Sequence, residues 1–217
     1  MKDPRVAKLA KVMINYSLKV KKGQYMMLTG APVSQPLLLE CYRAAMKAGA
    51  NVETAITLPG ADEIFYNEST LAQRQWVSGT TKHRTRKLDA SCLILGSDNT
   101  RSLTNCDPKR MSEVAKARQP MRKIWMKRAG DGDLNWTLTQ WPTQASAQDA
   151  EMSLAEYEDF VFTAGGGTAG GPGGGLALGG GRGNDGSINP LDLNVPHIRA
   201  LGVEGNIPRP AFEDETE

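Results

Sequence analysis

Hydrophobic residues switch between helical and strand spacing along most of the chain. Apolar positions recur every three or four residues in segments that predict helices at residues 4–19, 34–48, 62–67, 71–77, 108–129 and 153–162. Apolar and β-branched runs between them predict strands at residues 24–29, 51–58, 91–96 and 135–141. Strands separated by helices favour parallel pairing. The pattern therefore predicts a doubly wound α/β fold, with a mainly parallel sheet of about four strands and helices on both faces.

Two helices begin with the same signal. Asp3-Pro4 and Asp107-Pro108 each place a capping side chain before a proline at the first helical position. Pro120 is expected to kink or split the second of these helices, because proline cannot donate the hydrogen bond that a helix interior needs.

The other predicted helices carry different capping signals. Ser34 is expected to cap the helix at 34–48, and Gly49 stands where a left-handed residue closes a helix. Ser153 and Glu156 have the spacing of a capping box. These signals place the helix boundaries independently of the apolar pattern.

The loops that follow the strands are the predicted ligand-binding region, because open parallel sheets bind ligands at the carboxyl ends of their strands. Polar and aromatic side chains gather in two of these loops. The candidate ligand-loop residues are Asp98, Asn99, Thr100, Arg101, Trp141 and Thr143. An equally good interpretation of residues 98–101 is a turn that is capped by hydrogen bonds from its own Asn or Asp side chains.

Composition divides the chain after Phe162. Of 23 glycines, 13 lie between Thr163 and Gly186, where no side-chain pattern could form a core. Residues 1–162 carry 23 basic and 17 acidic side chains, a net charge of +6, whereas the remainder carries a net charge of −4. We therefore expect an α/β domain at 1–162, a disordered glycine-rich linker at 163–187 and an acidic, mostly irregular tail at 188–217.

Several classes of protein are disfavoured by the sequence. No apolar run approaches the roughly 18 residues of a membrane-spanning helix. The first residues, MKDPRVAKLAK, carry charges where a secretory signal has an apolar stretch. Cys41, Cys92 and Cys106 are widely spaced, and two of them lie in apolar segments, which is typical of buried thiols. The prediction is a cytoplasmic protein without a membrane partner.

Two phosphate-binding patterns are weak. Residues 165–170 spell GxGxxG, but they follow a helix, whereas the dinucleotide-binding motif follows a strand. Residues 82–87 are strongly basic and could contact phosphates, although a solvated helix face is the commoner origin of such a run. The aromatic residues of single-strand binders are missing nearby. We therefore expect no nucleic-acid partner.

Common catalytic motifs are also absent. His83 and His197 have no metal-ligand neighbours at useful spacing, and neither HExxH nor GxSxG occurs. Glu156, Glu158 and Asp159 occupy the first turns of a capped helix, where the helix dipole accounts for acidic residues. The sequence assigns no catalytic, cofactor-binding or metal-binding residue and no cofactor to this chain.

Several segments nevertheless resemble one enzyme family, the thermophilic metallo-aminopeptidases of the aminopeptidase T, aminopeptidase S and PepS group. The resemblance covers residues 1–162. It rests on the segments DPRVAKLA from Asp3, YSLKV from Tyr16, NTRSL from Asn99 with Asp107-Pro108, and WPTQASAQDAEMSLAEYEDFV from Trp141. The last of these is the most specific. The resemblance identifies the N-terminal domain of such an enzyme.

This resemblance implies a cytoplasmic, usually homodimeric exopeptidase that removes N-terminal residues from peptides with two divalent metal ions of the zinc or cobalt type. In that family the metal ligands come from a second, C-terminal domain, whose motifs have no match in this chain. We therefore expect a truncated, non-metal-binding half without its own catalytic site. The alternative is a stand-alone α/β binding or interaction module that uses the strand-end loops near Asn99 and Trp141.

Overall fold

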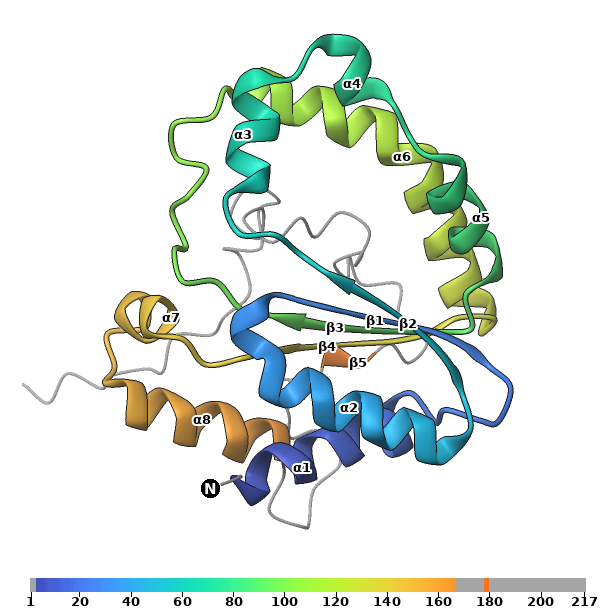
Figure 1. Cartoon of the computed structure of the whole chain (residues 1–217), viewed down its shortest axis with the longest axis vertical. Helices are drawn as coiled ribbons and strands as arrows, with labels where there is room; N and C mark the ends of the chain where they lie inside the picture. Colours follow the sequence, from blue (N-terminus) through green and yellow to red (C-terminus); the bar gives the residue numbers. More distant parts are fainter. Residues whose placement is uncertain (1–2, 167–177, 180–217) are drawn as a thin grey trace, which may run out of the picture.

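The sheet is the centre of the fold. The computed structural model describes residues 3–166 and 178–179. Four parallel strands are β1 (Tyr25–Gly30), β2 (Asn51–Ile56), β3 (Ala90–Leu95) and β4 (Asn135–Gln140). Their order is β2-β1-β3-β4, and the short β5 (Leu178–Gly179) pairs antiparallel with β4 (Figure 1). The four-stranded parallel sheet confirms the predicted fold class.

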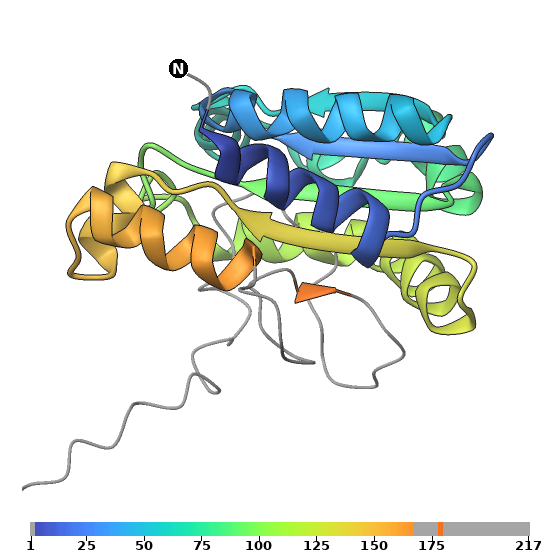
Figure 2. The same cartoon turned by 90° about the horizontal axis from the view of Figure 1, so that it is seen from below.

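Helices lie on both sides of this sheet, as predicted for a doubly wound fold (Figures 1 and 2). One side carries α1 (Pro4–Lys11), the π-helix η1 (Val12–Ser17), α2 (Gln35–Ala48) and α8 (Leu154–Gly166). The other side carries α3 (Ala61–Glu68), α4 (Leu71–Gln75), α5 (Gly79–Lys87) and α6 (Pro108–Asp131). Two short helices, η2 (Pro32–Ser34) and α7 (Gln144–Asp149), follow strand ends and were not predicted.

Two apolar clusters hold the layers together. On the α1 side, Leu9 and Met13 pack with Leu37 of α2 and with Leu28 of β1. On the α6 side, Trp125 and Trp136 lie with their ring centroids 5.4 Å apart. All six residues of β3 are buried, because this strand lies between β1 and β4 and is covered on both faces.

Most of the predicted helix caps are present. The carboxylates of Asp3 and Asp107 accept the backbone N–H groups two residues later, each at 2.8 Å. Gly49 ends α2 with φ of +80°. The Ser153 backbone N–H donates to Glu156 at 2.9 Å, and the Glu156 N–H donates back to the Ser153 hydroxyl at 3.3 Å, which completes the capping box.

Two details of the helix predictions were wrong, namely the Ser34 cap and a split of the helix at Pro120. Ser34 precedes α2 but does not cap it, because its hydroxyl donates to the Ala31 carbonyl at 2.8 Å within the turn of η2. Pro120 does not split α6, which runs continuously over 24 residues. Val114 and Trp125, on either side of Pro120, are both buried beneath the helix. Figure 1 shows that α6 curves along its length, in keeping with a bend at a proline.

The cysteines are buried and free, as the apolar segments predicted. The hydrogen bond with Cys41, together with burial, raises the pKa of the Cys92 thiol. The segments predicted to be a disordered linker and an irregular tail lie outside the described residues, apart from the last turn of α8 and β5. Residues 178–179 form a strand where none was predicted.

Candidate functional site

The loops after β1, β3 and β4 meet at the carboxyl edge of the sheet. A Cβ atom added to Gly96 would lie 3.1 Å from Val33 Cγ1 and 3.4 Å from Trp141 Cβ. The Trp141 backbone N–H donates to the Leu95 carbonyl. A larger residue at this crossing would have to push Val33 aside by a few tenths of an ångström, so Gly96 allows the close approach that places Trp141.

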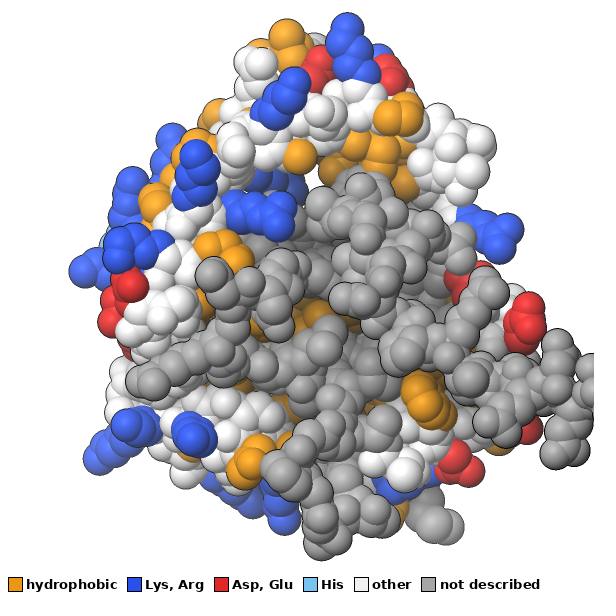
Figure 3. All heavy atoms as spheres, turned by 180° about the vertical axis from the view of Figure 1, so that it is seen from behind, with side chains coloured by type: hydrophobic (Ala, Val, Ile, Leu, Met, Phe, Trp, Pro, Cys, Tyr) orange, Lys and Arg blue, Asp and Glu red, His pale blue; other side chains and the backbone are white. Residues whose placement is uncertain are grey.

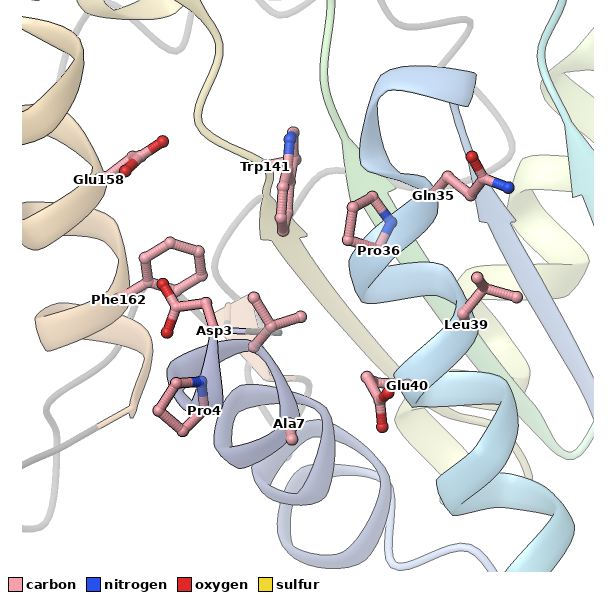
Figure 4. A pocket seen from close by; sticks show the side chains of 11 residues that line it. Asp3, Pro4, Ala7, Gln35, Pro36, Leu39, Glu40, Trp141, Glu158 and Phe162 are labelled. Carbon is pink, nitrogen blue, oxygen red and sulfur yellow. The ribbon is translucent and has the colours of Figure 1, made fainter. Parts of the chain in front are cut away.

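A pocket of about 630 Å³ opens beside Trp141 (Figure 4). The amino-terminal ends of α1 and α2 and the middle of α8 form its walls. Trp141 meets Phe162 edge to face, with ring centroids 5.9 Å apart and planes at 79°. The apolar part of its lining comprises Pro4, Val6, Ala7, Pro36, Leu39, Trp141 and Phe162. Such a pocket suits an apolar side chain or a small apolar ligand.

The pocket also has an acidic rim. Asp3, Glu40 and Glu158 contribute carboxylates, and no Lys or Arg lines the pocket. Hydrogen bonds from the Arg5 side chain and backbone lower the pKa of Asp3, so its carboxylate stays ionised. Asp3 is paired with Arg5 at 2.8 Å and Glu40 with Arg43 at 3.3 Å, so arginines next to the pocket offset two of the three rim carboxylates.

Arg5 links α1 to α8 next to this rim through ion pairs and a contact with an aromatic ring. Its guanidinium contacts Asp159 as well as Asp3 and lies 4.9 Å from the centre of the Phe162 ring. These contacts raise the pKa of Arg5, first through the hydrogen bond with Asp3. Arg5 is thus a structural residue that positions Phe162 in the pocket wall.

The loop after β3 is a turn held by its own polar groups. Asp98, Asn99, Thr100 and Arg101 are exposed. The Asn99 side-chain oxygen accepts the Arg101 backbone N–H at 2.9 Å, and the Ser97 hydroxyl donates to the Asn99 carbonyl at 2.8 Å. These are the hydrogen bonds of the capped turn that the sequence allowed as an alternative. A ligand role for residues 98–101 stays a prediction.

Thr143 joins the loops after β3 and β4. It is 4% exposed, and its hydroxyl donates to the Ser97 carbonyl at 2.8 Å. The same hydroxyl caps α7 by accepting the Ser146 N–H at 3.2 Å. Arg101 reaches Asp149 of α7 at 3.7 Å. Of the six predicted residues, Trp141 lines the pocket, whereas Thr143 supports the loops around it.

Sequence reasoning missed most of the pocket wall. Pro36 and Leu39 lie at the start of α2, directly after a strand-end loop that was singled out, so the strand-end rule could have included them. In the sequence, Phe162 only marks the position after which the composition changes. Nothing in the sequence indicated that α1 and α8 would meet at this pocket.

Two other sequence patterns were weak candidates for phosphate binding. The basic run lies on α5, where Arg84 pairs with Glu53 at 3.5 Å and Thr85 is buried beneath the helix. Figure 3 shows Lys and Arg side chains spread around the rim of this face and separated by other side chains. Most of the GxGxxG string, beyond Gly166, lies outside the described residues.

The described residues contain no group of three or more His, Cys, Asp or Glu side chains that could hold a metal ion. The helices that the structure describes also include none that is long and apolar enough to cross a bilayer.

Comparison with known proteins identifies the class. Residues 2–168 match the thermophilic metalloprotease family (M29), and the chain therefore belongs to that family. A search of curated proteins found no match. Among solved structures, wild-type AmpT from Thermus thermophilus resembles this fold with a TM-score of 0.59 and 16% sequence identity. The alignment covers 75% of this chain but 42% of AmpT, so this chain spans less than half the length of that protein.

Proposed function

We propose that this α/β domain serves a metal-dependent aminopeptidase that releases N-terminal amino acids from peptides. The supporting observation is the M29 family match over residues 2–168, which covers the described α/β domain. In this proposal the domain shapes the peptide-binding side of the enzyme or supports a homodimer, the protein is cytoplasmic, and the chain is a piece of a larger enzyme without its own metal site.

Metal chemistry is assigned to the family and not to the described residues. When bound, two divalent ions would activate a water molecule and polarise the scissile carbonyl. The described part of the chain holds no cluster of suitable ligands, and His83 is an exposed residue of α5. These residues therefore do not fit a metal pair, and we derive no catalytic step from them.

The family-based proposal is tested with the full chain, aminoacyl anilides, and cobalt or zinc ions. We expect no turnover above that of the metal ions alone, and no stoichiometric tight metal uptake by elemental analysis after gel filtration. The control is an intact aminopeptidase under the same conditions. Turnover, or one or two metal ions retained per chain, would show that this chain carries its own catalytic site.

A second candidate function is a stand-alone binding or interaction module at the strand-end loops near Asn99 and Trp141. One observation favours it, namely the apolar pocket that includes Trp141. An apolar peptide side chain could enter there, and the acidic rim would attract a neighbouring ammonium group.

This candidate is tested by titrating the chain with short peptides that begin with Leu or Phe and measuring the heat of binding by isothermal titration calorimetry. Trp141→Ala should abolish binding, while Trp76→Ala should preserve it, because Trp76 is 72% exposed and does not line the pocket. Circular dichroism checks that both variants fold. Equal binding by the two variants would rule out this pocket.

A further inference from the structure

Strand β2 is an open edge of the sheet. It pairs only with β1 among the described residues (Figure 1). The backbone N–H of Asn51 donates to the carbonyl of Gln24, just before β1, at 2.8 Å, and that of Thr57 donates to the carbonyl of Gly30 in β1 at 3.0 Å. The backbone N–H and C=O groups of successive residues point to opposite sides of a strand. Those of Val52, Thr54 and Ile56 therefore point away from β1, toward the open side of the edge. This edge can accept another strand.

Apolar side chains flank the edge. Leu39, Tyr42 and Met46 of α2 are spaced three and four residues apart and are 55%, 39% and 40% exposed. Ile56 and Leu58, at the end of β2, are 53% and 75% exposed. We call these five residues the α2–β2 strip. Contiguous exposed apolar side chains of this kind mark interaction surfaces.

A groove of about 370 Å³ runs between α2 and β2 within the strip. None of the residues that line it is charged. They include Leu28, Leu38, Leu39, Tyr42, Thr54 and Ile56. A partner that fills the groove would therefore present apolar side chains and no unpaired charge.

The usual protection of an edge strand is missing from β2. Exposed edges are commonly blocked by Lys, Pro or a bulge. The one charged residue of β2 is Glu53, which hydrogen-bonds the Tyr25 hydroxyl and pairs with Arg84 of α5 at 3.5 Å. Its side chain thus lies on the α5 side of the sheet, away from the groove. The backbone groups of β2 are therefore available to pair with a strand of a partner.

We propose that the α2–β2 strip binds a second copy of this chain, with the two β2 strands pairing antiparallel about a two-fold axis at Thr54. Such an interface uses the same patch on both copies, so the patch must complement itself. The strip meets this condition because it carries no charge. The pairing also sets Glu53 opposite Ala55 of the second copy, so no like charges face each other.

This arrangement makes one sheet continuous through both copies. It also brings the two α2 helices side by side on one face, so that Leu39, Tyr42 and Met46 face the same row of the second copy. The inference gives a surface to the homodimer in the proposed function. It does not depend on the proposed peptidase activity.

The first test measures the association of the full chain by sedimentation equilibrium. We expect a dimer whose dissociation constant rises at least tenfold in Ile56→Lys and in Leu39→Lys. Ile64→Lys and Leu71→Lys are matched controls, because these residues are 59% and 47% exposed and lie outside the strip. The controls should associate as the unmodified chain does, and circular dichroism verifies that each variant folds.

The second test fixes the register and does not rely on weakening the interface. In Thr54→Cys the two introduced thiols would face each other across the two-fold axis, at a spacing that a disulfide can bridge. Glutathione disulfide as oxidant should convert this variant to a cross-linked dimer. Glu53→Cys should remain uncross-linked because Ala55 lies opposite, and the native cysteines are buried.

Three results would overturn the proposal. One is a chain that stays monomeric at every concentration, including a monomer that binds an extended peptide at this edge instead. Another is a dimer that the Ile56→Lys and Leu39→Lys changes do not weaken. The third is cross-linking of Glu53→Cys but not of Thr54→Cys. Because no readout is catalytic, failure here is separate from failure of the aminopeptidase proposal.

Discussion

Neighbouring side chains at the carboxyl edge of the sheet serve different purposes. Trp141 points its ring into the pocket, whereas Thr143, two residues later, buries its hydroxyl between two loops. Asn99 uses its amide oxygen within its own turn. Residue type and position after a strand indicated a polar edge correctly, but the partner of each side chain decides whether it can meet a ligand.

Thr143→Val should destabilise the domain by about 1–2 kcal/mol, because it leaves the Ser97 carbonyl without its donor and removes the cap of α7. Urea unfolding followed by circular dichroism measures this loss. Thr143→Ser should restore most of it. Thr104→Val is the comparison, since Thr104 makes a similar bond to a carbonyl but is exposed and should cost little. Equal losses at both positions would contradict this account.

At the scale of single elements, local signals placed the helix ends better than their interiors. The caps at Asp3, Asp107 and Ser153 act between residues two or three positions apart, so the sequence contains all the necessary information. Pro120 is different, because its effect on α6 depends on the packing of residues that follow it. A local rule therefore does not decide whether the proline splits the helix or only bends it.

The stability that the capping box contributes to α8 should fall at acidic pH. Hydrogen bonds from the Ser153 side chain and backbone lower the pKa of Glu156. The cap therefore contributes stability above the ordinary glutamate pKa, and the contribution is lost as pH falls through the lowered pKa of the folded state. Carboxyl NMR titration should find the Glu156 pKa below that of exposed glutamates.

The control for this prediction is Glu156→Gln, which keeps an acceptor at the capping position but cannot titrate there. Amide exchange at the start of α8 should lose its pH-dependent loosening in this variant. An ordinary pKa for Glu156, or the same acid response in Glu156→Gln, would show that the capping box does not control the helix end.

On the scale of the whole molecule, the positive charge is spread over several elements. Residues 1–162 carry a net charge of +6, but Arg84 is paired with Glu53, and the pocket beside Trp141 is rimmed by carboxylates. Long-range attraction of anions then follows from total charge, and it should be strongest on the side of the sheet that carries α5 and α6, which hold 12 of the 23 Lys and Arg side chains of residues 1–162.

Binding to heparin tests this distribution. The double change Lys82→Ala and Lys87→Ala should reduce retention on a heparin column by the same amount as Lys116→Ala with Lys123→Ala. The four lysines are exposed, and each pair removes the same charge from α5 or from α6. A clearly larger effect of the α5 pair would identify the basic run as a phosphate-binding site.

The sequence by itself determined where most strands and helices lie along the chain, the parallel sheet, the helix caps at Asp3, Asp107 and Ser153, and the resemblance to M29 peptidases. These features depend on short-range periodicity, capping geometry and contiguous motifs. The pocket between Trp141, Phe162 and Pro36 required the tertiary structure, because three segments far apart in sequence form it. The open edge at β2 is likewise a property of strand order, since no local pattern says which strand ends a sheet.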